Sequence, residues 1–145
     1  MKKKYMILGG IGCILVLAMV TPYLYVSLSS KNVISNILRS SLNNYGEFDA
    51  RYEGIISEYH YSQLCFRVQP SKRGYEEEGV VERYDWTISI DVHDSEHVSA
   101  IIYYGYKLTD RNGKVITSIT SGKIEVEMIK KDSGWVIVSV HEIFP

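Results

Sequence analysis

Charge is missing from one long stretch of the sequence. Tyr5 to Val26 holds 22 residues without a charged side chain, between Lys2–Lys4 on one side and Lys31 further on. At about 1.5 Å per helical residue this run reaches roughly 33 Å, enough to cross a bilayer core of about 30 Å. The lysines ahead of the run favour a cytoplasmic amino terminus. The sequence therefore predicts a single-pass cell-membrane anchor over residues 1–30, with the remainder outside the cytoplasm.

A cleaved signal peptide and a lipoprotein are the alternatives to this anchor. Signal-peptide apolar regions usually run about 7–15 residues, shorter than this one, although Ser27-Leu28-Ser29 is an acceptable cleavage site. Cys13 is a possible lipid acceptor, but the apolar stretch ahead of it is short and lacks the usual lipobox. We therefore favour an uncleaved signal-anchor, with Tyr23 and Tyr25 in the interfacial aromatic belt, over secretion after cleavage.

Cysteine is scarce throughout, and positive charge is scarce beyond the leader. Cys65 is the only cysteine after Cys13, so no disulfide can form within residues 31–145 and the core must hold the fold. This part is about 115 residues long, the size of one ordinary domain. It carries 13 Lys and Arg against 17 Asp and Glu. A nucleic-acid binder needs clustered positive charge, so no nucleic-acid partner is expected.

The motifs of several enzyme classes are also missing. The sequence holds no Gly-rich phosphate loop, no Ser nucleophile elbow and no CxxC pair. Cys65 has no neighbouring His or Lys to activate its thiol. The sequence therefore predicts no enzyme activity, no catalytic residue and no cofactor.

Two amphipathic segments follow the leader. After a polar connector at Ser29–Asn32, apolar residues on one helical face predict a helix over residues 33–45, ended by Gly46. A second helix is predicted over residues 47–59, with acidic residues near its start. From residue 60 to 69 apolar and polar residues alternate, which predicts a strand.

The second half of the chain predicts antiparallel strands over residues 80–92, 98–108, 114–130 and 135–144. Turns are expected at 93–97, at 110–113 with its Asn-Gly pair, and at 131–134. Ser121-Gly122 marks a bend in the third strand. Residues 71–79, with three consecutive glutamates, are predicted to form an exposed connection. The sequence thus predicts an α+β fold in which one or two helices pack on a curved antiparallel sheet of four or five strands.

The last of these hairpins resembles a known family. Residues 123–142 read KIEVEMIKKDSGWVIVSVHE. They are similar to the final hairpin of nuclear transport factor 2-like (cystatin-like) domains, in which an alternating strand and a Lys/Asp/Gly turn precede a Trp and an apolar pair. The resemblance implies a cystatin-like domain over residues 31–145, carried by a bacterial membrane anchor. It implies no particular activity, since one fold serves many functions. The family usually has more helix before the sheet than the alternation at 60–69 predicts.

One local cluster of metal-ligating types occurs, in the turn between the first two strands of the second half. His93, Asp94, Glu96 and His97 bring two imidazoles and two carboxylates into five residues. Such groups can ligate a borderline metal such as zinc. No other part of the sequence points to the same centre, so a solvated polar turn is the favoured interpretation.

Residues on the predicted strands are the other candidates. Asp85 and Asp91 share parity with polar neighbours, so we expect surface carboxylates. His141 either lines a cavity mouth or ends a core strand. The closely spaced Tyr103, Tyr104 and Tyr106 form a possible binding surface for a peptide, a glycan or a protein. Packing across the sheet explains the same tyrosine pattern and is the favoured interpretation.

The sequence favours a membrane-tethered binding or assembly module with a protein partner. The alternatives are a small ligand-binding protein or enzyme that uses the cone-shaped pocket of the fold, and self-association through long edge strands.

Overall fold

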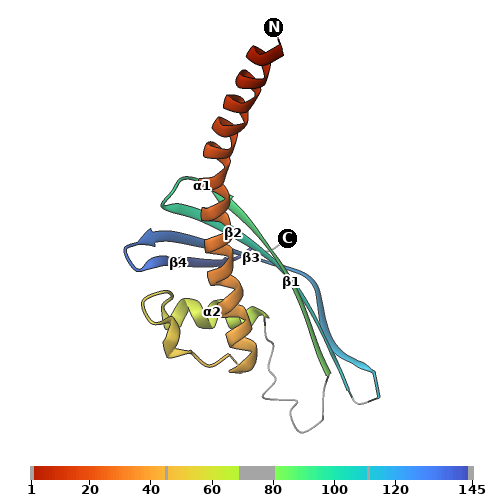
Figure 1. Ribbon diagram of the computed structural model, residues 1–145. Helices are drawn as coiled ribbons and strands as arrows, with labels where there is room; N and C mark the ends of the chain where they lie inside the picture. The colour runs from red at the N-terminus through yellow and green to blue at the C-terminus, as the bar shows by residue number, and fades with distance from the viewer. Residues whose placement is uncertain (1, 45, 69–80, 111, 144–145) are drawn as a thin grey trace.

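The computed structural model describes residues 2–44, 46–68, 81–110 and 112–143, and only the backbone of residues 2–17, 19, 43, 66–68, 81–84, 108 and 117. Its helices are α1 (Lys2–Asn43) and α2 (Glu58–Val68), with a short 3-10 turn η1 (Ala50–Tyr52) between them. Its strands are β1 (Val81–Val92), β2 (His97–Thr109), β3 (Val115–Lys131) and β4 (Gly134–Glu142). They form one antiparallel sheet in the order β1-β2-β3-β4, crossed by the helices (Figure 1). The predicted α+β architecture is confirmed for these residues.

Helix α1 runs without a break from the apolar run into the domain. The polar connector predicted at Ser29–Asn32 is therefore wrong. The hydroxyls of Ser29 and Ser30 donate to the carbonyl oxygen of Val26 at 3.1 and 2.9 Å. These serines satisfy their polar groups on the preceding turn of the helix, and so they do not end it.

The predicted anchor falls largely outside the side chains that the structure describes, which begin at Ala18. Within the described part of the chain, no helix is both long enough and apolar enough to cross a bilayer. Figure 1 shows the amino-terminal half of α1 extending beyond the sheet, while its carboxyl-terminal half lies against the sheet.

The core lies between the carboxyl-terminal half of α1, helix α2 and one face of the sheet. Each fully buried aliphatic side chain contributes about 1.5–3 kcal/mol relative to an exposed one. The buried members of this cluster are Val26, Ile34, Ile37, Leu38, Ile56, Tyr61, Leu64, Cys65, Ile88, Val98, Ala100, Ile102, Tyr104, Ile124, Val126, Met128, Trp135 and Ile137.

Two predictions ahead of the sheet are wrong. The predicted helix over residues 47–59 is instead η1 and a turn, in which Gly54 adopts a φ of 79° that a helix excludes.

The predicted strand over 60–69 is replaced by α2. Tyr61, Leu64 and Cys65 are buried together at helical spacing. Ser57 Oγ accepts the His60 N–H at 3.1 Å, as an N-cap does. A short apolar run fits both the helical period of about 3.6 residues and the strand period of two residues. Here the serine cap and the contact with α1 favour the helix.

The four predicted strands after residue 80 are confirmed within two or three residues at each described end. The predicted bend in β3 coincides with a bulge. Tyr104 pairs with Gly122 and Tyr106 with Ile119, so two residues of β3 stand opposite Gly105. A bulge of this kind bends and twists the strand that carries it.

The edge formed by β4 is partly covered by the segment before α2. Ile56 forms a parallel bridge with Ile137, and the Ile137 N–H donates to the carbonyl oxygen of Ile55 at 2.7 Å. Strand β4 also contains an extra residue, Val138, because Glu127 pairs with Ser139 while Met128 pairs with Ile137. This extra residue reverses the alternation of the strand beyond it.

Gly122→Ala is expected to destabilise the protein. A Cβ at this position would lie 2.1 Å from Cζ of Tyr104, so the ring would have to leave its place over β3. Overpacking of this kind costs about 1–3 kcal/mol. Urea unfolding of the full chain in detergent, followed by circular dichroism, measures the effect. Ser121→Ala, at the exposed neighbouring position, is the control. Equal midpoints for the two variants would contradict the described contact.

Candidate functional site

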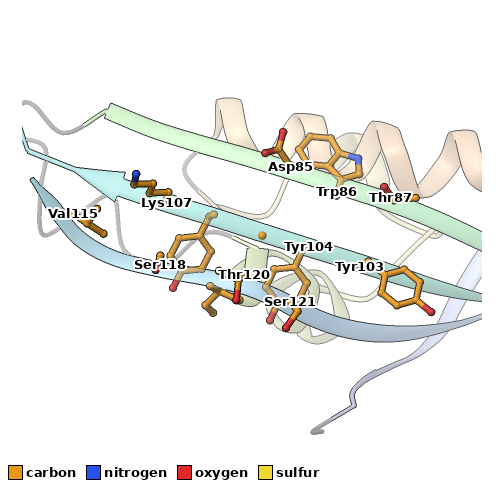
Figure 2. A pocket seen from close by; sticks show the side chains of 13 residues that line it. Asp85, Trp86, Thr87, Tyr103, Tyr104, Lys107, Val115, Ser118, Thr120 and Ser121 are labelled. Carbon is orange, nitrogen blue, oxygen red and sulfur yellow. The ribbon is translucent and has the colours of Figure 1, made fainter. Parts of the chain in front are cut away.

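A hollow with a volume of about 940 Å³ lies along β1, β2 and β3, near the bulge in β3. Figure 2 shows its side chains on these three neighbouring strands. We call it the arm hollow. It is lined by Asp85, Trp86, Thr87, Tyr103, Tyr104, Gly105, Tyr106, Lys107, Val115, Ser118, Ile119, Thr120 and Ser121.

The sheet register shows that residues from both faces of the sheet line the arm hollow. Trp86 pairs with Tyr104, and Tyr106 with Ile119, on the face of the core. Thr87 pairs with Tyr103, and Lys107 pairs with Ser118, so these four lie on the face opposite the core. All four are exposed. Gly105 stands between them, where a Cβ would lie 3.1 Å from the carbonyl oxygen of Ile119. The lack of a side chain at the bulge therefore allows β3 to approach β2 closely, and it leaves the surface hollow there.

The predicted tyrosine surface is split between the two faces of the sheet. Tyr103 is 48% exposed, whereas Tyr104 and Tyr106 are 5% and 8% exposed and belong to the opposite face. The Nζ of Lys123 lies 5.8 Å from the centre of the Tyr103 ring. The three rings therefore do not share one face of the sheet, although all three residues line the arm hollow, and a binding role for them stays a prediction. Packing across the sheet explains two of them, and Tyr103 alone presents its ring to solvent.

His141 lies apart from the arm hollow. It is exposed near the end of β4, where its Nε2 is 2.6 Å from Oγ of Ser139. Strict alternation along β4 would place His141 on the face of Trp135 and Ile137, but the extra residue Val138 reverses the alternation between them. His141 is therefore an exposed residue near the end of β4 and does not line the arm hollow.

The cluster in the turn between β1 and β2 is organised as a capped turn. Asp94 accepts the backbone N–H groups of Glu96 and His97 at 2.7 and 2.8 Å, and its carboxylate lies 2.9 Å from Nδ1 of His97. These hydrogen bonds lower the pKa of Asp94. Nε2 of His93 is directed to Oγ of Ser99 at 2.7 Å. Among the described residues, no group of three or more His, Cys, Asp or Glu side chains is placed to hold a metal ion.

The two strand carboxylates fall at different places. Asp85 lines the arm hollow and is exposed, and Asp91 is exposed further along β1. Both lie on the face opposite Ile88 and Ile90, as the alternation predicts. Glu76, Glu77 and Glu78 lie outside the described residues.

A polar cluster missed by the sequence analysis joins the end of α1 to η1. Asp49 caps η1 and accepts Oγ of Ser40 at 2.6 Å, Nδ2 of Asn44 at 3.2 Å and Nε of Arg51 at 3.0 Å. Its side chain is only 9% exposed. The hydrogen bonds from Arg51 and then from Ser40 hold the pKa of Asp49 far below its usual range. An Asp two residues before an Arg was the available signal, but a predicted helix over these residues obscured it.

Cys65 and Tyr61 are buried under this cluster, on α2. Burial raises the pKa of the Cys65 thiol to about 12, and it also raises the pKa of Tyr61. The thiol is therefore kept protonated, and thiolate chemistry is suppressed. Tyr61 instead serves the core, with its ring edge-on to Phe48 at a centroid distance of 5.3 Å.

The sequence matches no protein-family model and no curated protein. Two solved structures from Catenulispora acidiphila are similar in fold, each with a TM-score of 0.52 and 14% identity. The first, in complex with S-DNPA, is matched over 83% of this chain and 92% of that chain. The second is matched over 86% and 94%.

A third structure is the intermembrane space region of the chloroplast protein ARC6, with a TM-score of 0.42 and 16% identity over 80% of this chain and 95% of that chain. The likeness to the first two structures concerns the fold alone. It is consistent with the nuclear transport factor 2-like type.

Asp49→Asn is expected to lower stability in a pH-dependent manner. The folded pKa of Asp49 lies below the usual value, so its contribution is fully present above about pH 4 and is lost as the pH falls through the folded pKa. The urea midpoints of wild type and variant should therefore differ at about pH 7 and converge at lower pH. Asp132→Asn, in an exposed turn, is the control. A difference that stays constant with pH would contradict the assignment.

Cys65 is expected to resist alkylation in the folded chain. In a Cys13→Ser background, iodoacetamide at about pH 8 should leave Cys65 unmodified until denaturant is added, because the thiol is buried and protonated. Mass spectrometry reads the modification. As a matched control, Ser62→Cys places an exposed thiol on the same helix once both native cysteines are replaced, and it should react at once. Modification of folded Cys65 at the rate of the control would show that α2 opens readily.

Proposed function

We propose that the chain is a non-catalytic module that is held at a membrane by its apolar amino-terminal run and binds a protein partner at the arm hollow. The membrane part of this proposal is supported by the 22 uncharged residues from Tyr5 to Val26 and the three lysines that precede them. Anchoring a binding surface raises its effective concentration near other membrane proteins.

The observation that carries the proposal is the open, hydroxyl-rich character of the arm hollow. Thr87, Ser118, Thr120 and Ser121 are exposed there, and Tyr103 adds one accessible ring. Sites for small molecules bury roughly 70–90% of the ligand surface. A hollow that lies along three strands and is open to solvent cannot enclose a ligand in that way. It suits a protein surface that supplies hydrogen-bonding groups and covers the Tyr103 ring.

The interior of the fold supports a non-catalytic role. In enzymatic members of the resembling family, an acid or His inside the cone transfers protons. Here the space between helices and sheet is filled by fully buried apolar side chains, including Ile34, Leu64 and Met128. Among the described residues, no Asp, Glu or His belongs to this buried core cluster. The polar groups buried in that interior are serine hydroxyls, the Tyr61 hydroxyl and the Cys65 thiol, and burial raises the pKa of the last two.

A small-molecule carrier is the second candidate function. It is favoured by one observation, the complex of a Catenulispora acidiphila structure of similar fold with S-DNPA. In this chain such a ligand would have to enter from the arm hollow.

Site-specific crosslinking tests the proposed partner site. A photoreactive residue in place of Val115 or Ser118, in the full chain within the cells that make it, should give one discrete protein adduct. The same residue in place of Val138, which is similarly exposed on β4, is the matched control and should give none. The Tyr103→Ala substitution should reduce the adduct several-fold, because a buried aromatic contact typically carries about 1–2 kcal/mol or more of binding energy.

Two results would overturn the partner site. Equal adducts from positions 115 and 138 would mean random encounter. No adduct, together with a rise in melting temperature on adding a small ligand that Tyr103→Ala abolishes, would favour the carrier instead.

A further inference from the structure

The joint between the apolar run and the domain has no linker. Helix α1 passes directly from exposed Tyr25 to buried Val26 and Ser30. Nε1 of Trp135 donates to Oγ of Ser29 at 2.9 Å, which fixes β4 against the helix. The position of the domain relative to the amino-terminal half of α1 is therefore set by direct contacts.

Large exposed apolar side chains gather on α1 immediately before this joint. In the described part of the chain, five of them fall within nine consecutive residues of the helix. They are Val20, Tyr23, Leu24, Tyr25 and Leu28. A contiguous apolar surface of this kind marks an interaction site, because exposing it to water is unfavourable.

A basic and aromatic group from the sheet lies beside the same turn of the helix. The Nζ of Lys130 is 5.9 Å from the centre of the Tyr25 ring and 6.0 Å from that of Trp135. Lys131 follows it and is exposed. Tyr and Trp rings with neighbouring lysines are typical of the layer between hydrocarbon and water, where rings sit among headgroups and ammonium groups reach phosphates.

The dimensions of a bilayer agree with this placement. If the hydrocarbon ends near Val26, Ser29 and its partner Trp135 lie about 5 Å beyond it at 1.5 Å per residue. The headgroup layer is about 5–7 Å thick on each side of the membrane. Lys130 and Trp135 then fall within that layer. Trp86 lies about 26 Å further along the sheet, eight residues of β3 at about 3.3 Å each.

We propose that Lys130, Lys131 and Tyr25, beside the buried Trp135, form a lipid seat that rests the domain on the phosphate layer of a bilayer. This inference depends on the proposed membrane anchorage. Acidic residues in the adjoining turns, Asp94, Glu96 and Asp132, keep the net charge of this end of the sheet low. The lipid seat therefore depends on local contacts of Lys130 and Lys131 with phosphates. The arm hollow lies further along the sheet, around Trp86.

Tryptophan quenching tests the lipid seat, because the chain has two tryptophans. The full chain is reconstituted in vesicles of equal parts phosphatidylcholine and phosphatidylglycerol that contain a headgroup nitroxide lipid. Trp86→Phe leaves Trp135 as the reporter, and Trp135→Phe leaves Trp86 as the matched control. Quenching of Trp135 should exceed that of Trp86 roughly two-fold or more, given their separation of about 26 Å. Circular dichroism verifies that both variants are folded.

Charge reversal identifies the lysine contact. Lys130→Glu should reduce the quenching of Trp135, and the loss should be larger with phosphatidylglycerol present than with phosphatidylcholine alone. Lys114→Glu, an exposed lysine at the far turn of the sheet, makes the same charge change and should have no effect.

The outcomes separate the two proposals. A chain that is washed from vesicles by alkaline carbonate overturns the membrane anchorage and the lipid seat together. A chain that resists carbonate but shows equal quenching of Trp135 and Trp86 overturns the lipid seat alone. Equal effects of Lys130→Glu and Lys114→Glu overturn the role of Lys130.

Discussion

The whole domain depends on the apolar stripe along the carboxyl-terminal half of α1. Ile34, Ile37 and Leu38 have no exposed surface, and α2 and the sheet pack around them. Without disulfides within the domain, this contact must hold helices and strands together. The cluster of Asp49 at the end of α1 and the Trp135 contact at Ser29 then fix both ends of the packed segment. A single helix thus contributes to the core of the fold with its carboxyl-terminal half and extends beyond the sheet with its amino-terminal half.

Sequence patterns predicted the sheet well, because long alternating strands and an Asn-Gly turn leave few alternatives. The patterns failed where the apolar residues of a short segment fitted both the helical period and the strand period. Residues 60–69 alternate as a strand would, yet Tyr61, Leu64 and Cys65 meet α1 on one helical face. The family resemblance, with its extra helix, was the better guide at this point. Ser29 and Ser30 looked like a connector, since the sequence alone could not show that their hydroxyls bond back to Val26.

The candidate site was less accessible from sequence than the fold. Tyr103 and Asp85 were recognised, but the arm hollow depends on a bulge, which only strand pairing reveals. A second bulge at Val138 likewise moved His141 to an unexpected position. One inserted residue reverses the facing of all that follow, so errors of parity accumulate along a strand. Hydroxyl side chains carry no distinctive spacing, and Ser118, Thr120 and Ser121 therefore gave no warning of a shared surface.

Because α1 is uninterrupted, the number of residues in this helix also determines the orientation of the domain around the helix axis. Each residue added to a helix turns everything beyond it by about 100° around the axis, and 3.6 residues complete one revolution. An insertion or deletion before Ser29 would therefore rotate the whole sheet about the axis of α1, relative to the amino-terminal end of the helix. A change of seven residues alters the azimuth of the domain by about 20° and a change of four by about 40°, whereas a change of two turns the domain by about 200°.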